Sequence, residues 1–533
     1  MTKQSNLNSE SSSPLVTMHS ALTNLEVIYT ISSYTQCRSL PALASTCRAF
    51  KHPALNALWR DLQSMEPLVK CLPSDLFSID EDDRVVLQKP IDSKLWDTLF
   101  EYLFRVHSIT VTQTSIPSAV IEHLNLLMLA SPSTTMSWFP NLHKLTWHAN
   151  GTRIFAPILR MALVPSMLVL NVEISLPPDY TFLSVLSSLG ALCPYLQNMT
   201  FRIRHESEDL TLGSLPQISP FIAQPMSQLH HLHTLSIWDA GSEVLELVMR
   251  LRAIQSLSLD LRASSAWGEK PRFQSPGFDC LKWFNISTRT IWHASNFFSS
   301  LRVVKSKQIK VDVASTRTRL PRRSQLITEF FAILQERCDH DILEYLSLSI
   351  GHSKGLSPKP SDFTPLRAFS NLTHLLIAGT GNISNSDEGL CQLAKALPKL
   401  QVLKINETKL STQSPTFHGL INLIWCCPAL TSLALAIDTT ESEGIDPKCP
   451  GSGRCNKRLK CLALENSTIN DPVNVALIIS GLFPSLEQVD LAYWGTFYKD
   501  KMDTMSPWVI VNNVLHGFRV ARERRVESWS DCL

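Results

Sequence analysis

The chain has 533 residues, of which 44% are hydrophobic and 18% are charged, so it can bury a large core and is expected to be mostly ordered. Its formal net charge of +2 gives no overall electrostatic footprint for nucleic acid or for an anionic membrane. No stretch approaches about 18 uninterrupted apolar residues, so no transmembrane span is expected.

Residues 1–20 are polar and Ser-rich, which predicts a disordered tail, and they lack the apolar run of a secretory signal. The 13 cysteines are scattered, and many fall at apolar positions of helical or strand patterns. Such cysteines are expected to be reduced intracellular thiols. The expected location is cytoplasmic or nuclear.

Residues 21–66 contain three short amphipathic segments with helical spacing. Pro41 and Pro53 fall near the starts of the second and third segments, where a missing N–H costs little. Three helices of this length bury too little surface to be stable without a partner or a docked neighbour, so the module is expected to bind something. The apolar positions are Leu22, Leu25, Ile28 and Tyr29, then Leu40, Leu43, Ala44 and Cys47, then Leu55, Leu58, Trp59 and Leu62.

Residues 67–98 are interpreted as a linker, in which the acidic run Asp80, Glu81, Asp82 and Asp83 predicts an exposed loop. From residue 99 to residue 515 the phrase L-x-x-L-x-L recurs. Its six most regular copies begin 29, 28, 30, 29 and 27 residues apart. They are Leu343/Leu346/Leu348, Leu372/Leu375/Ile377, Leu400/Leu403/Ile405, Leu430/Leu433/Leu435, Leu459/Leu462/Leu464 and Leu486/Val489/Leu491.

The same phrase appears seven times upstream with looser spacing, which gives thirteen copies in all. The fourth and sixth residues of the phrase point to one side of a short strand, and the sequence between copies has helical period. The upstream copies are Val106/Ile109/Val111, Leu142/Leu145/Trp147, Met167/Leu170/Val172, Leu196/Met199/Phe201, Leu232/Leu235/Ile237, Ile254/Leu257/Leu259 and Leu281/Phe284/Ile286.

Two basic segments interrupt or follow this pattern. Residues 302–324 are interpreted as an irregular insertion that carries Arg317, Arg319, Arg322 and Arg323, and residues 516–533 as a C-terminal tail. Aromatic residues do not alternate with these arginines, so solvated loops are favoured over a nucleic-acid site.

An ordinary α/β domain would explain the alternation of strands and helices but not the fixed spacing, which is typical of a stack of repeated units. The phrase resembles the leucine-rich-repeat family over roughly residues 100–500. That family usually carries Asn or Cys two residues beyond each strand. Here only Asn150 matches, while later copies hold Gly351, Thr380, Thr408, Asp438 and Ser467. The expected fold is therefore α/β, an irregular leucine-rich-repeat-like solenoid preceded by a small three-helix module.

The N-terminal module resembles an F-box, as found in fungal F-box proteins with leucine-rich repeats. The residues that carry the resemblance are Leu22 to Ile28, Arg38 to Phe50 with its Cys-Arg-x-Phe core, His52 to Leu55, and the Leu58-Trp59 pair. The resemblance implies that the module docks on the Skp-type adaptor of a cullin-RING ubiquitin ligase. The implied adaptor-binding residues are Leu22, Leu25, Ile28, Tyr29, Leu40, Leu43, Cys47, Leu58 and Trp59. The alternative is that these helices only cap the N-terminal end of the repeats.

The repeats are expected to bind a protein substrate through exposed strand positions, such as Thr373, His374, Gln401, Val402, Thr431 and Ser432. No G-x-S-x-G, G-x-x-x-x-G-K-[ST] or H-E-x-x-H motif is present, so neither catalysis nor a cofactor is expected. Cys449, Cys455 and Cys461 lack the paired spacing of a zinc site. The sequence thus predicts a non-enzymatic substrate receptor of a ubiquitin ligase, or alternatively a repeat scaffold or inhibitor without a ligase role.

Overall fold

The computed structural model describes most of the chain in two compact units, Met1–Val185 and Leu186–Leu533. The described residues are 24–81, 84–112, 118–131, 137–149, 151–175, 179–204, 219–238, 241–262, 273, 277–314, 323–351, 360–379, 386–405, 414–464, 467–491 and 507–530. Several predictions fall on residues outside these ranges: the tail at residues 1–20, Leu22, Asp82, Asp83, Asn150, Thr380, Thr408, Arg317, Arg319 and Arg322.

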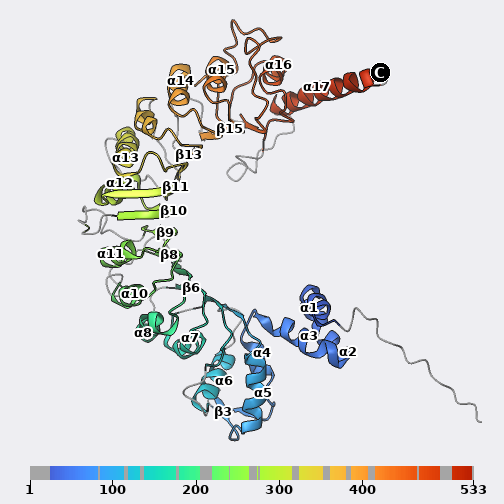
Figure 1. Cartoon of the computed structure of the whole chain (residues 1–533), viewed down its shortest axis with the longest axis vertical. Helices are drawn as coiled ribbons and strands as arrows, with labels where there is room; N and C mark the ends of the chain where they lie inside the picture. The colour runs from blue at the N-terminus through green and yellow to red at the C-terminus, as the bar shows by residue number, and fades with distance from the viewer. Residues whose placement is uncertain are drawn as a thin grey trace, which may run out of the picture. The chain divides into compact units, whose positions relative to one another are not determined.

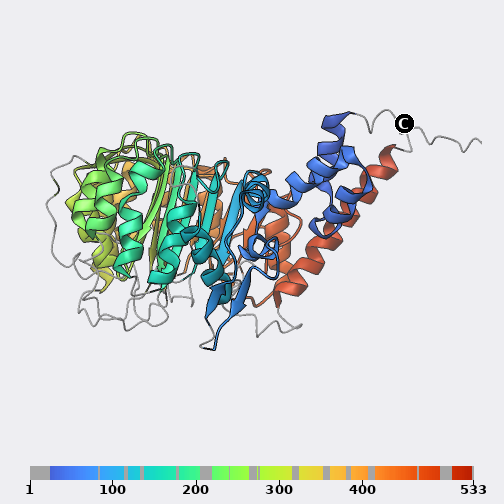
Figure 2. The same cartoon turned by 90° about the horizontal axis from the view of Figure 1, so that it is seen from below.

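The first unit begins with three helices and continues with parallel strands in the order β1-β4-β5-β6. A separate antiparallel hairpin, β2–β3, is drawn in blue at the bottom of Figure 2. The elements are α1 (Leu25–Tyr34), the 3-10 helix η2 (Cys37–Ser39), α2 (Leu40–Thr46), α3 (Arg48–Arg60), β1 (Asp61–Leu62), α4 (Glu66–Lys70), β2 (Phe77–Ile79), β3 (Val85–Leu87), α5 (Ser93–Leu103), β4 (Ser108–Thr112), α6 (Ser118–Leu129), β5 (Lys144–His148), η4 (Arg153–Phe155), α7 (Ala156–Ala162), β6 (Val169–Ser175) and α8 (Tyr180–Ser187), the last at the boundary.

The second unit alternates parallel strands with helices, and its strand order β7 to β16 follows the chain. Its elements are α9 (Leu189–Leu192), β7 (Asn198–Arg204), α10 (Ser219–Met226), β8 (Thr234–Trp238), α11 (Ser242–Arg250), β9 (Ser256–Asp260), β10 (Gly277–Thr288), α12 (Ile291–Ser300), β11 (Val303–Val313), α13 (Arg323–Arg337), β12 (Tyr345–Ile350), η7 (Pro360–Ala368), β13 (His374–Ala378), α14 (Asp387–Ala396), β14 (Val402–Ile405), α15 (Phe417–Cys426), β15 (Ser432–Ala434), β16 (Cys461–Ala463), α16 (Pro472–Leu482) and α17 (Pro507–Ser530).

The repeated phrase corresponds to the strands. Twelve of the thirteen copies coincide with β4 to β10 and β12 to β16, and the last makes a single bridge between Leu462 and Val489. Parallel pairing aligns the fourth residue of each phrase with that of the next, and all of these residues are buried. In the second unit this buried row runs Met199, Leu235, Leu257, Phe284, Ile309, Leu346, Leu375, Leu403, Leu433 and Leu462.

The helices of the second unit cover one face of these strands, with α10 to α16 on one side of β8 to β15 (Figure 1). The predicted apolar stripes are the buried ones: Leu390, Leu393, Ala394 and Leu397 of α14, Leu420, Leu423, Ile424 and Cys427 of α15, and Val475, Ile478, Ile479 and Leu482 of α16. Each strand–helix unit therefore buries its apolar face only together with its neighbours, which is the arrangement of a solenoid-like α/β fold.

The prediction of an irregular insertion over residues 302–324 is wrong for its first half, because residues Val303–Val313 form β11. This strand pairs in parallel with β10 on one side and β12 on the other. Ile309, Val311 and Val313 are buried, whereas Lys310 and Asp312 between them are only half-buried. Charged residues that alternate with β-branched residues form a strand with one solvated face, and this period of two was mistaken for a basic loop.

Two predicted boundaries also need correction. The linker at residues 67–98 contains α4, the β2–β3 hairpin and the start of α5, and Val85 of the hairpin donates its N–H to Glu122 Oε2 of α6 (3.1 Å). The C-terminal tail at residues 516–533 is helical as far as Ser530, since it belongs to α17. Trp508, Val511 and Leu515 of this helix are buried, so it is part of the second unit's core.

Successive strand–helix repeats are joined by side-chain to backbone hydrogen bonds at the start of several strands. Asn371 Nδ2 donates to Asp341 O (2.8 Å), and Asn456 Nδ2 donates to Leu430 O (2.9 Å). Beyond the strands, Ser467 Oγ accepts the N–H of Ile437 (2.8 Å). Asn371 and Asn456 precede their strands, and of the three only Ser467 occupies the position beyond the strand where the resembled repeats have Asn or Cys.

The C-terminal edge of the second unit is closed by a helix side chain. Asn512 of α17 accepts the N–H of Val489 through Oδ1 (2.8 Å) and donates through Nδ2 to the carbonyl of Val489 (3.0 Å). The amide thus supplies both bonds that a further strand would make to this residue. Because unpaired buried backbone groups are costly, α17 protects an otherwise open sheet edge.

We expect Asn512→Leu to destabilise the C-terminal end of the array by on the order of 1–3 kcal/mol, because the N–H and C=O of Val489 lose their partners. Hydrogen exchange measured by mass spectrometry over residues 486–491 should become faster. The matched control is Asn513→Leu on the exposed face of the same helix, which should leave this exchange unchanged. Equal exchange in both variants would show that Asn512 does not hold the edge.

Candidate functional site

The N-terminal module is a small three-helix unit with apolar side chains both inside and outside. Asn24 caps α1 by accepting the N–H of Glu26 (2.9 Å), and the helix then exposes Leu25, Tyr29 and Tyr34. Tyr34 is 87% exposed and Leu25 is 58% exposed. Leu25 and Tyr29 lie about one turn apart on the same side of this ten-residue helix, whereas Tyr34, nine residues after Leu25, lies on the other side. Large apolar side chains left in water favour a partner.

The structure divides the predicted adaptor-binding residues into three groups. Leu25 and Tyr29 are exposed. Leu43, Cys47 and Leu58 are half-buried. Ile28, Leu40 and Trp59 are buried within the chain itself, and their part in adaptor binding stays a prediction.

Trp59 packs against Tyr102 of α5 with 4.8 Å between ring centroids, so its ring joins the module to the rest of the first unit. Helical spacing identifies an apolar position but does not tell whether the chain itself covers it. Tyr34 was missed because it stands in a polar stretch, and an aromatic residue among serines was its only signal.

The module is also joined directly to the strands of the first unit. The chain leaves α3 as β1, whose Asp61 and Leu62 pair in parallel with Ser108 and Ile109 of β4. This pairing covers the edge of β4, as expected if the helices cap the repeats. Capping involves β1 and α3, whereas the exposed side chains lie on α1, so the two roles use different parts of the module.

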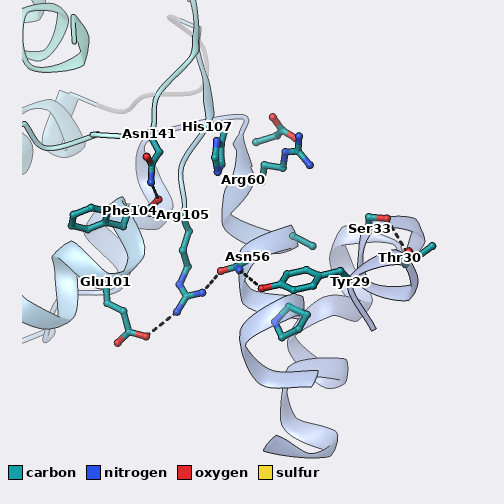
Figure 3. Close-up of a pocket in the computed structure, with 13 residues that line it drawn as sticks. Tyr29, Thr30, Ser33, Asn56, Arg60, Glu101, Phe104, Arg105, His107 and Asn141 are labelled. Carbon is teal, nitrogen blue, oxygen red and sulfur yellow. Dashed lines mark hydrogen bonds and ion pairs between the residues drawn. The ribbon is translucent and has the colours of Figure 1, made fainter. Parts of the chain in front are cut away.

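A cavity of about 970 Å³ lies between α1, α3 and the segment at residues 101–107 (Figure 3). Its polar side chains bond mainly to one another. Arg105 donates to Asn56 Oδ1 and to Glu101 Oε1 (2.8 Å), and Asn56 Nδ2 donates to the hydroxyl of Tyr29 (3.4 Å). The network braces the module against α5, and it offers no nucleophile beside a base for catalysis.

The exposed strand face of the second unit carries the predicted substrate positions. His374, Val402 and Ser432 lie on one register line, and all are half-buried. Thr373 and Thr431 use their hydroxyls within the fold, because they donate to the carbonyls of Glu344 (2.9 Å) and Gln401 (3.1 Å). Gln401 is exposed at the start of β14.

Two aromatic residues on the same register line were missed by the sequence analysis. Trp283 of β10 and Tyr345 of β12 align with His374 through Gln308 of β11. Each stands in an ordinary x position of its phrase, and nothing in the sequence places them together. Their proximity depends on the register of strands about sixty residues apart.

Lysines border this line. Lys404 of β14 lies near His374, and burial first, then the charge of Lys404, lower the pKa of that imidazole below its ordinary value of 6.5. The folded state therefore disfavours protonated His374. The contribution of neutral His374 to the free energy of unfolding is complete above the pKa of this group in the unfolded chain, which is about 6.5. It is lost as the pH falls from that value through the pKa of His374 in the folded chain.

We expect Lys404→Ala to raise the pKa of His374 part of the way towards 6.5, since burial continues to oppose the charged ring. The measurement is an NMR titration of histidine-labelled chain, with the His374 signal assigned by His374→Gln. The control is Lys395→Ala on the exposed face of α14, which should leave the titration unchanged. An unchanged His374 pKa in Lys404→Ala would place Lys404 away from this surface.

Among the described residues, His, Cys, Asp and Glu side chains form no group of three or more that could hold a metal ion, and Cys449, Cys455 and Cys461 are free thiols. Within the same residues, no helix has both the length and the apolarity needed to cross a membrane. No model of a known protein family matches the chain, and no curated protein matches it either.

Proposed function

We propose that this chain is the substrate-recognition subunit of an SCF-type cullin-RING ubiquitin ligase. Its N-terminal module would act as an F-box that docks on a Skp-type adaptor and, through it, on the cullin. Its leucine-rich-repeat-like solenoid would hold a protein substrate on the exposed strand face. Catalysis would come from a separate ubiquitin-conjugating enzyme brought close to the substrate.

The observation that carries the proposal is that α1 exposes three large apolar side chains, Leu25, Tyr29 and Tyr34. Full burial of a large apolar side chain contributes about 1.5–3 kcal/mol, so leaving these side chains in water is unfavourable for a small module. The same stretch carries the resemblance to an F-box. A docked adaptor would cover exposed side chains of this helix.

The alternative is a leucine-rich-repeat scaffold or inhibitor with no ligase role. The pairing of β1 with β4 favours it, because this pairing gives the module a structural task without an adaptor. Both proposals use the strand face to bind a protein. They differ only in what covers α1.

We expect the full-length chain to form a stable complex with a recombinant Skp-type adaptor in size-exclusion chromatography. The double variant Leu25→Asp with Tyr34→Asp should weaken the complex by at least about tenfold, because it places charge on both sides of α1, so that whichever side docks must desolvate a carboxylate. Both side chains are exposed, so the fold should be retained, and circular dichroism checks this. Trp59→Ala would be a poor test, since Trp59 is buried in the module.

The matched control is Leu129→Asp on α6, where the leucine is 84% exposed and lies outside the three-helix module. It should bind the adaptor as the wild type does. A folded wild-type chain that forms no complex would contradict the ligase proposal and leave the scaffold. Equal weakening by Leu129→Asp would show that α1 is not the docking surface.

A further inference from the structure

The segment at residues 454–460, which leads into β16, is held in place by a buried asparagine. Asn456 Nδ2 donates to Leu430 O (2.9 Å), and its Oδ1 accepts the N–H of Arg458 (2.7 Å). The backbone N–H of Asn456 donates to Leu482 O (2.8 Å). The segment is therefore fixed between the turn after α15 and the end of α16, two helices that lie side by side at one end of the array (Figure 1).

Four of the seven side chains of this segment are cationic and exposed: Arg454, Lys457, Arg458 and Lys460. Because Asn456 fixes the backbone between them, they leave the surface from ordered positions. Within the part of the chain that the structure describes, none of the ion pairs involves any of the four. Their charge is open to a bound anion.

An exposed tryptophan stands beside these cations. Trp425, in the last turn of α15, is 45% exposed, and the guanidinium carbon of Arg454 lies 4.4 Å from its ring centroid. The guanidinium and the indole are both planar and attract each other as a cation–π pair. Together they offer flat surfaces on which a further planar group can stack.

The turns that flank the segment add one lysine and one carboxylate. Besides the four cations, residues 397–401, 427–431 and 483–488 carry only Lys399 and Glu487 as charged groups. Glu487 and Lys460 each stand two residues before the partners of one bridge between strands, so they are neighbours, and Glu487 is also 4.0 Å from Arg519 of α17. This single carboxylate offsets one of the five cations. Trp425, Lys399, Arg454, Lys457, Arg458 and Lys460 are together named the basic edge.

The carboxylates of the preceding loop lie towards the other end of α15. Nε2 of His418, in the first turn of α15, donates to the carbonyl of Glu443 (3.0 Å). Arg454 stacks seven residues further along the helix, a rise of about 10 Å. Asp446 closes its own turn by accepting the backbone N–H of Lys448 (2.9 Å). The positive charge of the basic edge is thus a local excess, which the net charge of +2 for the whole chain conceals.

We propose that the basic edge binds single-stranded nucleic acid, with successive phosphates against its lysines and Arg458 and with a base stacked on the Trp425–Arg454 pair. Phosphates neutralised by lysine and arginine release counterions, which favours binding at low salt. Stacking on an aromatic side chain accepts any base. In a duplex the bases are already stacked on one another, so a single strand is the better occupant. All residues of the basic edge belong to the second unit, and the site is independent of the adaptor proposal.

An acidic peptide is the less suitable occupant of this surface. It can place carboxylates against the lysines, but it covers the Trp425–Arg454 pair only if an aromatic residue falls at one particular place. Every nucleotide carries a planar base next to a phosphate. A polynucleotide therefore meets both features at once.

The test is fluorescence anisotropy of the full-length chain with a labelled oligouridylate about twelve nucleotides long, a length within the usual range of single-strand sites. Four phosphate contacts predict that the logarithm of the binding constant falls with the logarithm of the salt concentration with a slope of about −3. The double variant Lys457→Gln with Arg458→Gln should raise the dissociation constant at least about tenfold and make the slope shallower by about 1.4.

Trp425→Ala should raise the dissociation constant by about fivefold or more, because it removes the stacking platform. It should leave the salt slope unchanged, since the cations of the segment remain. A merely structural role of the tryptophan would not separate affinity from salt slope in this way. Circular dichroism checks that both variants are folded.

Matched controls lie in earlier repeats of the same unit. Arg252→Gln with Lys282→Gln removes the same charge from two exposed positions, of which Arg252 lies in the equivalent turn between α11 and β9. Trp292→Ala removes a tryptophan that is 37% exposed on α12. Both controls should bind the oligonucleotide with the affinity and the salt slope of the wild type.

Three results would overturn the proposal. The first is a folded wild-type chain that does not bind the oligonucleotide. The second is a loss of affinity in the controls as large as that in the variants of the basic edge. The third is equally tight binding of a glutamate peptide of the same length, which would identify an acidic protein segment as the occupant.

Discussion

The in-register stacking of one buried side chain per unit is the constraint on which the rest of the structure depends. From Met199 to Leu462 the fourth residue of each phrase lies beside its counterpart in the neighbouring strand, with Ile309 of β11 standing between Phe284 and Leu346, and each is buried. A single strand and helix cannot bury this residue alone, while full burial of such a side chain contributes about 1.5–3 kcal/mol. The fold is therefore stable only as an array, and slipping one strand by a residue would expose its whole apolar set.

The same register creates the exposed face. Because side chains alternate along a strand, the buried row has an outward row beside it, and residues about thirty or sixty positions apart become neighbours. Trp283, Tyr345 and His374 meet in this way. The function we propose for this face thus follows from the packing on the other face, since the leucines and phenylalanines inside fix where the rings stand outside.

An array of strands also needs its edges covered, and each unit solves this locally. In the first unit β1, the continuation of α3, pairs with β4. In the second unit Asn512 of α17 satisfies both backbone groups of Val489. A module that covers an edge is fixed in place, and α1 of the N-terminal module then presents Leu25 and Tyr34 outward. The same forty residues of the N-terminal module thus cover a sheet edge and carry the side chains proposed to bind the adaptor.

The sequence by itself determined the repeated strand–helix units and their buried faces, because a period of about 28 residues and the apolar stripes are local features. It missed β11, where Lys310 and Asp312 alternate with Ile309, Val311 and Val313, since a strand with one charged face and no leucines lacks the leucine signal. Only the tertiary structure decided which apolar residues of the N-terminal module are core and which are surface. Ile28 and Tyr29 have the same helical pattern, yet Ile28 is buried and Tyr29 is exposed. Likewise, only the register across distant strands brought Trp283 and Tyr345 to His374.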